Sequence, residues 1–207
     1  RQFKALLHVG ATMVEASIRL LDKRQVGAGE EALAAARLSH PIVALGNTRL
    51  VLRSFAEIAD YGRTLGGGVL LWPRFVKPRE RNLMRLAMLE SEDRVVVTTS
   101  AVYLCGLNGV EQRELPSLVE LDSEQLAESV KGAGGELITL AGNPPRIIHR
   151  EHFDHLAERI LEFVSAYHQS NPRKQGMPRE ELRTKLPDQV LRSVVDQVVS
   201  RLVASVS

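Results

Sequence analysis

The first third of the chain alternates hydrophobic and polar residues with a period of two, which is typical of half-buried β-strands. Between residues 13 and 21, Val14, Ala16 and Ile18 fall on one side and polar residues on the other. Shorter apolar segments lie at residues 3–9, 32–38, 40–44, 50–53 and 69–72, separated by turns rich in glycine and asparagine. Short strands at this spacing, with no helical period between them, predict a small β-barrel over residues 1–75.

After a proline-flanked linker at residues 72–78, the apolar positions recur every three to four residues, which predicts helices. We expect helices at residues 82–90, 95–107 and 124–130, followed by short strands at residues 136–140 and 146–148. Helices followed by a two-stranded hairpin are the layout of a winged-helix module. The sequence therefore predicts such a module over residues 76–149.

The last segment begins with a long amphipathic helix whose apolar stripe runs from Phe153 to Tyr167. Pro178 stands where a helix should start, and two glutamates follow in the first turn, where carboxylates suit the helix dipole. A third helix covers residues 190–202. Three helices with short loops predict a second winged-helix module over residues 150–207. We expect this module to be truncated, with its wing missing, because the sequence ends where the hairpin should follow.

Composition narrows the class of protein. The 207 residues are 44% hydrophobic and 25% charged, which is ordinary for a globular protein, and no apolar run is long enough to suggest a membrane span. The single cysteine, Cys105, excludes an intrachain disulfide and lies in an apolar stretch, so we expect a buried structural thiol. Without disulfides or an export signal, the expected location is the cytoplasm.

The overall charge of +2 is unevenly distributed. Residues 1–75 contain 10 Lys and Arg against 6 Asp and Glu, residues 76–149 contain 8 against 11, and residues 150–207 contain 9 against 8. Basic patches are the electrostatic signature of nucleic-acid binding. We therefore expect a polyanion to meet the first segment or one face of the last, and not the acidic middle segment.

In the first segment, arginines at predicted strand ends are candidates for phosphate contacts, since the planar guanidinium can hold a phosphate with two hydrogen bonds. These residues are Arg49, Arg53 and Arg63. The alternative is that Arg49 and Arg53 pair with carboxylates of the same domain, such as Glu57 or Asp60.

In the last segment, cations cluster around a predicted helix-turn-helix and could line an RNA backbone, which proteins contact largely through phosphates and shape. The alternative is a solvated helix face balanced by Glu180 and Glu181. The cations are Arg173, Lys174, Arg179, Arg183 and Lys185.

Residues for catalysis or metal binding are not indicated. The three glycines at residues 66–68 precede a strand and lack the lysine of a phosphate-binding loop, so a tight crossing of strands explains them better. His149, His152 and His155 are three apart at a helix start, but no cysteine is near them, and we expect surface histidines. We predict no catalytic residue, no metal and no cofactor in this chain.

Two stretches resemble a known family. The first is Gly-Asn-Thr-Arg-Leu-Val-Leu-Arg at residues 46–53, preceded by Pro-Ile-Val-Ala and followed by Arg-Thr-Leu-Gly-Gly-Gly-Val-Leu at residues 63–70. It resembles the third domain of translational GTPases of the elongation factor Tu type, and the selenocysteine-specific branch most closely. The second is His-Gln-Ser-Asn-Pro at residues 168–172 with Gly-Met-Pro-Arg-Glu-Glu-Leu-Arg at residues 176–183. It is similar to a signature between the first two helices of a winged-helix repeat in the same factors.

The resemblance implies a part of an elongation factor that delivers selenocysteinyl-tRNA to the ribosome at recoded UGA codons. The barrel would contact tRNA near Arg63 and Thr64, with Arg49 and Arg53 close by. The winged helices would lead to a more C-terminal module that reads an mRNA stem-loop. GTP and Mg²⁺ would bind a GTPase domain outside this chain, so the chain itself is expected not to be an enzyme. A monomer without membrane contact is expected.

A different class of function also fits part of the pattern. A transcription regulator could bind DNA through its winged helices while the barrel binds a ligand or a partner. This alternative explains the helix-turn-helix but not the barrel motif, and the acidic middle segment argues against it.

Overall fold

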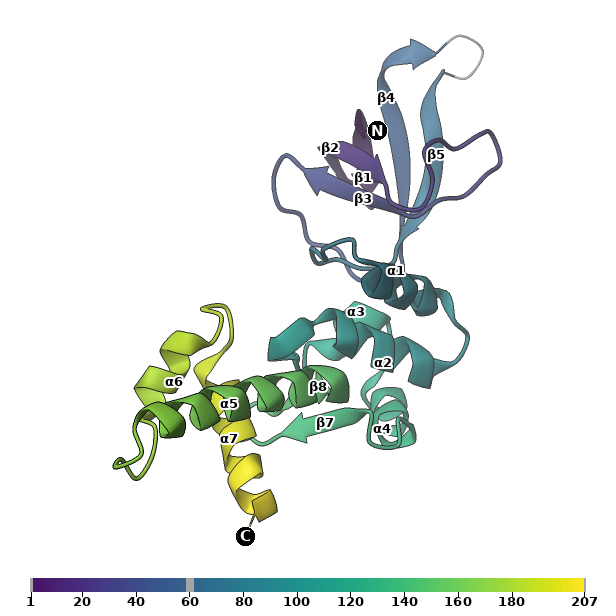
Figure 1. Cartoon of the computed structure of the whole chain (residues 1–207). Helices are drawn as coiled ribbons and strands as arrows, with labels where there is room; N and C mark the ends of the chain where they lie inside the picture. The colour runs from purple at the N-terminus through teal and green to yellow at the C-terminus, as the bar shows by residue number, and fades with distance from the viewer. Residues whose placement is uncertain (1, 59–61, 207) are drawn as a thin grey trace. The chain divides into compact units, whose positions relative to one another are not determined.

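The computed structural model describes residues 2–58 and 62–206. The chain divides into two compact units (Figure 1). The first contains the residues up to Glu90 together with Ser117–Glu120, and the second contains Ser91–Pro116 and the residues from Leu121 onward. The three domains predicted with boundaries at residues 75 and 149 stay a prediction.

The first unit is built on an antiparallel sheet with strand order β3-β2-β1-β4-β5. One face of this sheet is apolar: Ala5, Leu7, Val14, Ala16 and Ile18 are each no more than 5% exposed. The alternation in the sequence is therefore confirmed as a half-buried sheet. The strands are β1 (Gln2–Val9), β2 (Thr12–Leu20), β3 (Ala34–Leu38), β4 (Thr48–Ile58) and β5 (Gly62–Leu70).

The predicted barrel is not confirmed. Strands β3 and β5 form the two edges of the sheet, and no pairing between described residues joins them. The segment at residues 40–44, which we predicted to be a strand, is a loop instead. Its Pro41 has no N–H to donate to a strand partner. Ile42 and Ala44 still pack against the apolar face, which accounts for the hydrophobic pattern that suggested a strand.

The three glycines lie within β5 and not before it. A Cβ on Gly67 would lie 3.3 Å from the carbonyl oxygen of Leu50 on β4, whereas a Cβ on Gly66 would meet no atom within 4 Å. Close approach of two strands thus accounts for Gly67 but not for Gly66. The register between β4 and β5 shifts at Leu52 and Arg53, as at a β-bulge.

After a short helix α1 (Glu80–Ala87), the chain follows the connectivity of a winged helix: helix, strand, two helices and a hairpin. The three short strands pair in the order β6-β8-β7. The helices and hairpin predicted for this segment are confirmed; β6 and α3 were too short to show a periodic pattern. The elements are α2 (Arg94–Leu104), β6 (Val110–Glu111), α3 (Leu115–Val119), α4 (Ser123–Gly132), β7 (Leu137–Leu140) and β8 (Arg146–His149).

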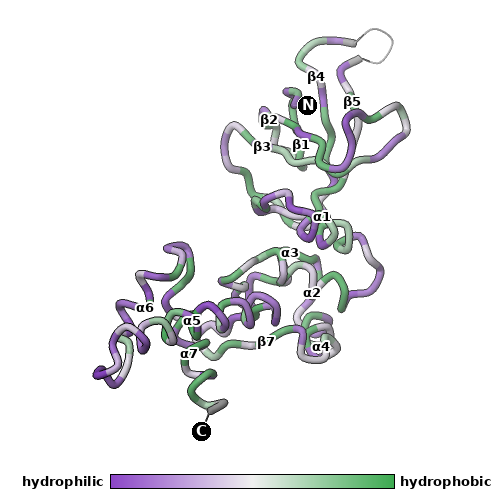
Figure 2. The backbone as a smooth tube through the Cα atoms, in the orientation of Figure 1, coloured by the Kyte–Doolittle hydropathy of each residue, from purple (hydrophilic) through white to green (hydrophobic). Residues whose placement is uncertain are grey.

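The last three predicted helices are confirmed as α5 (Arg150–Ser170), α6 (Arg179–Lys185) and α7 (Arg192–Val206). Hydrophilic and hydrophobic segments alternate along α5 (Figure 2), and its apolar stripe is buried. The core formed by these helices also contains Ile138 and Leu140 of β7 and Ile148 of β8. The hairpin of the preceding winged helix is therefore part of the same core as α5, α6 and α7.

The start of α4 offers a test of local stability. The Asp122 side chain accepts hydrogen bonds from the backbone N–H groups of Glu124 (3.0 Å) and Gln125 (2.8 Å), and the Gln125 side chain accepts one from the Asp122 N–H. We expect Asp122→Ala to lower the free energy of unfolding by about 1 kcal/mol, because a capping box is lost. Urea unfolding measures the change. Asp122→Asn keeps a capping oxygen and should lose less; equal losses would contradict this role.

Candidate nucleic-acid interface

The face of the sheet opposite the core carries the first candidate residues. Along β4, Arg49, Val51, Arg53 and Phe55 are exposed, while the residues between them are more buried. Leu50 and Leu52 pack against the apolar core. Because side chains alternate along a strand, Arg49 and Arg53 project from the outer face.

The strand register brings two predicted residues together. Arg53 of β4 lies opposite Thr64 of β5, and paired residues of neighbouring strands project to the same face. Arg49 lies opposite Val69, further along the same pair of strands. A guanidinium and a hydroxyl side by side on an exposed face can both hydrogen-bond phosphate oxygens.

Carboxylates engage these arginines only weakly. Arg63 Nε lies 3.9 Å from Glu57 Oε1, with the two side chains 50% and 79% exposed, so water and ions screen the pair. Arg49 and Arg53 form no ion pair with any carboxylate that the structure describes. Asp60, the other partner considered, lies outside the described residues.

The same face carries three cations that the sequence pattern alone did not single out. Lys4 on β1 lies opposite Ser17 on β2, which lies opposite Arg37 on β3, and Arg19 follows two residues after Ser17. These three side chains are exposed. Only the pairing register shows that they share a face with Arg49 and Arg53. We call Lys4, Arg19, Arg37, Arg49 and Arg53 the basic outer face.

The charge of this face has one sign almost throughout. Among the paired strand residues that project from it, Glu15 is the one carboxylate against five Lys and Arg. Met13, Val51 and Val69 add exposed apolar surface, at 57%, 41% and 44%. Cations mixed with exposed apolar side chains suit binding of a polyanion, not acid–base catalysis.

The cations predicted in the last segment have different roles. Arg183 donates to both carboxylate oxygens of Asp196 on α7, at 2.9 and 2.8 Å, and it also pairs with Glu180. Its hydrogen bonds to Asp196, above all, raise the pKa of the Arg183 guanidinium. The Lys174 ammonium lies over the ring of Tyr167, 5.5 Å from its centre. Arg173, Arg179 and Lys185 are exposed. Of these five cations, Arg183 thus has a structural role, because its bonds to Asp196 hold α6 to α7.

The histidine prediction was wrong for His149. It is 2% exposed and caps α5, since its Nδ1 accepts a hydrogen bond from the Glu151 N–H at 3.2 Å. His152 Nε2 lies 2.8 Å from the carbonyl oxygen of Tyr103. Over the described ranges, no group of three or more His, Cys, Asp or Glu is arranged to hold a metal ion. Cys105 is half-buried, and so less enclosed than we predicted.

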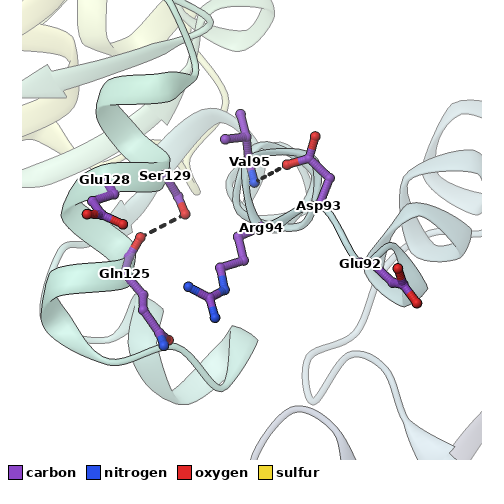
Figure 3. A pocket seen from close by; sticks show the side chains of 7 residues that line it. All are labelled: Glu92, Asp93, Arg94, Val95, Gln125, Glu128 and Ser129. Carbon is purple, nitrogen blue, oxygen red and sulfur yellow. Dashed lines mark hydrogen bonds between the residues drawn. The ribbon is translucent and has the colours of Figure 1, made fainter.

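A shallow, open depression lies between the first turn of α2 and helix α4, and Arg94 extends from α2 into it (Figure 3). Its polar groups already have local roles. Asp93 accepts a hydrogen bond from the Val95 N–H at 2.8 Å, and the Ser129 hydroxyl donates to the Gln125 carbonyl at 2.8 Å. With Glu92 and Glu128 also lining it, the depression does not suit a polyanion.

Comparison with known proteins gives two matches. Residues 161–205, from within α5 to the last turn of α7, match the family described as the winged helix of elongation factor SelB. The selenocysteine-specific elongation factor of Desulfomicrobium baculatum is 25% identical over 202 residues, which cover 96% of this chain and 31% of that protein. The chain thus spans about a third of its relative. The resemblance drawn from the sequence is confirmed. Across residues 2–58 and 62–206, no helix has the length and hydrophobicity needed to span a membrane.

Proposed function

We propose, from its relationship to selenocysteine-specific elongation factors over nearly its whole length, that the chain is the part of such a factor that joins tRNA to the mRNA-reading end. The observation that carries this proposal is the match over 96% of the chain together with the match to the SelB winged helix. The complete factor would deliver selenocysteinyl-tRNA to the ribosome at recoded UGA codons.

In this proposal the sheet acts as the third domain of an elongation factor and contacts the tRNA. The basic outer face supports this role, because its paired, described strand residues carry five cations against one carboxylate and such a face attracts phosphates. Arg63 and Thr64 lie at the start of β5, where the hydroxyl of Thr64 stands beside Arg53. RNA stems are recognised largely through the backbone, which requires donors of this kind.

The winged helices would act as an arm between the sheet and a more C-terminal module that reads an mRNA stem-loop. The acidic balance of residues 76–149 supports a connecting role for the first winged helix, since phosphate contacts need cations. GTP and Mg²⁺ would bind a GTPase domain elsewhere in the complete protein, which would act in the cytoplasm as a monomer.

Substituting Arg63 tests the tRNA contact. In the complete factor, we expect Arg63→Ala to weaken binding of selenocysteinyl-tRNA roughly tenfold, because a charge-assisted hydrogen bond contributes about 1.5–3 kcal/mol. GTP hydrolysis by the factor without tRNA should not change. Filter binding at fixed salt measures the affinity, and Arg113→Ala, an exposed arginine of the winged-helix segment, is the matched control.

Two results bear on the proposal. Unchanged tRNA affinity in Arg63→Ala would remove this residue from the interface but would not overturn the proposal. If duplex DNA bound the complete protein more tightly than selenocysteinyl-tRNA at the same salt concentration, the chain would instead belong to a DNA-binding regulator.

A further inference from the structure

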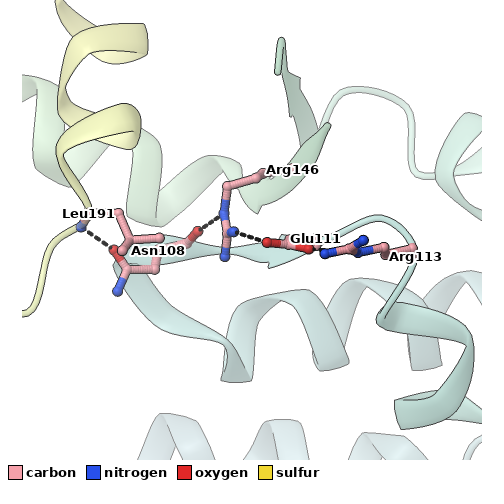
Figure 4. A network of polar contacts seen from close by, with 5 residues as sticks. All are labelled: Asn108, Glu111, Arg113, Arg146 and Leu191. Atoms are coloured by element: carbon pink, nitrogen blue, oxygen red, sulfur yellow. Dashed lines mark hydrogen bonds and ion pairs between the residues drawn. The ribbon is translucent and has the colours of Figure 1, made fainter. Parts of the chain in front are cut away.

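In the second unit, the winged helix from α2 to β8 and the helices α5 to α7 share a core. They are also joined by hydrogen bonds of the Asn108 side chain, which we call the polar clamp. Asn108 precedes β6, and its side-chain amide contacts the backbone just before α7 (Figure 4). Its Nδ2 donates to the Gln189 carbonyl at 2.7 Å, and its Oδ1 accepts from the Leu191 N–H at 2.8 Å. Both ends of one amide are thus used on the same short stretch of backbone, a pattern that a carboxylate cannot reproduce because it only accepts hydrogen bonds.

The residue that forms this clamp is itself held in place. Arg146 of β8 donates from Nε to the Asn108 carbonyl at 3.1 Å and from Nη1 to Glu111 Oε1 at 3.2 Å. Arg113 contacts the other oxygen of Glu111 at 2.9 Å (Figure 4). Arg146 thus fixes Asn108 to the hairpin sheet, so a movement of α7 against the sheet would break both hydrogen bonds of the Asn108 amide.

Helix α7 is anchored along its length. Gln197 Nε2 donates to the Ala141 carbonyl at 2.7 Å, and Arg201 Nη2 donates to the Thr139 carbonyl at 2.6 Å. These acceptors belong to β7 and to the turn after it. Asp196 is held by Arg183 of α6. In a helix-turn-helix that reads nucleic acid, the helix in the position of α7 supplies the base contacts. Here several of its polar side chains are engaged within the chain.

We propose that the β7–β8 hairpin and α7 form a fixed joint, so that the two winged helices move as one rigid body. In this joint α7 binds the hairpin and does not contact nucleic-acid bases. The shared core supplies the apolar part of this joint, and Asn108, Gln197 and Arg201 supply the directional part. The joint follows from contacts within the chain. Its use as a stiff arm in translation rests on the proposed function.

Distance measurements between spin labels test the joint without any RNA. In the full chain with Cys105→Ser, labels are attached through Glu124→Cys on α4 and Arg179→Cys on α6, both exposed. Double electron–electron resonance should give one narrow distance distribution. Adding Asn108→Ala and Arg201→Ala should broaden it and lower the midpoint of thermal unfolding by at least about 2–4 °C. Arg192→Ala, an exposed arginine at the start of α7 that takes no part in these contacts, is the control and should change neither.

A broad distribution in the unsubstituted chain would overturn the proposal, and so would a distribution that stays equally narrow in the double variant. If the double variant does not fold, Asn108→Asp replaces it. This variant keeps the acceptor for the Leu191 N–H and loses only the donor to Gln189, so its distribution should be broader than that of the unsubstituted chain, and an equally narrow one would overturn the proposal. The two sets of predictions are independent. If the distance measurements contradict the joint, the tRNA-binding predictions above still stand, and if the tRNA-binding predictions are wrong, the joint still stands.

Discussion

Replacing Ile148 with alanine is expected to destabilise both winged helices together. Ile148 lies on β8 and is fully buried, in a core that contains residues of β7, α5, α6 and α7. Removing most of a buried isoleucine side chain costs about 2–5 kcal/mol, because apolar packing is removed and a cavity remains. In a unit of this size each kcal/mol lowers the unfolding midpoint by about 4 °C.

Hydrogen exchange shows whether the destabilisation is shared. Amides of α4 and of α7 should lose protection in parallel in Ile148→Ala, since a common core makes one cooperative unit. Val43→Ala is the control, because Val43 is 96% exposed and its removal should change stability by less than about 0.5 kcal/mol. Loss of protection confined to α5–α7, with α4 unchanged, would show that the two winged helices unfold independently.

The double substitution Arg49→Ala with Arg53→Ala should have the largest effect on RNA binding. In the complete factor we expect the dissociation constant for selenocysteinyl-tRNA to rise roughly a hundredfold, since two charge-assisted hydrogen bonds are removed. The salt dependence should change as well. The slope of log affinity against log salt should fall by about one for each phosphate that the protein no longer neutralises.

Lysine substitutions separate charge from geometry at these positions. Arg49→Lys with Arg53→Lys keeps both charges but loses the planar fork, so it should keep most of the salt slope and lose part of the affinity. If the alanine variant kept the full slope, the outer face of β4 would not contact phosphates. The residues would then be solvated cations, as their lack of described carboxylate partners also allows.

Local patterns predicted the elements well, because alternation and helical periodicity are properties of short segments. The inner face of β1 and β2 and the buried stripe of α5 were evident from the sequence. The segment at residues 40–44 misled the prediction because a loop that packs two apolar side chains on a core has the composition of a strand.

Contacts between distant segments could not be predicted in this way. The strand order, which places Lys4, Arg19 and Arg37 on the same face as Arg49 and Arg53, depends on pairings across as many as about 50 residues. Arg183 was grouped with RNA-binding cations because its partner Asp196 lies on another helix. A basic cluster in sequence gives no information about which of its members already have partners.

The hairpin of β7 and β8 belongs structurally to two winged helices, which limits how the chain can be divided. Its residues Ile138, Leu140 and Ile148 lie in the same core as the helices that follow. A graft of α5, α6 and α7 onto another protein would expose this apolar surface unless residues 137–149 were transferred with them. The smallest transferable piece that contains α5, α6 and α7 is therefore larger than the second winged helix alone, and it begins before β7 and not after β8.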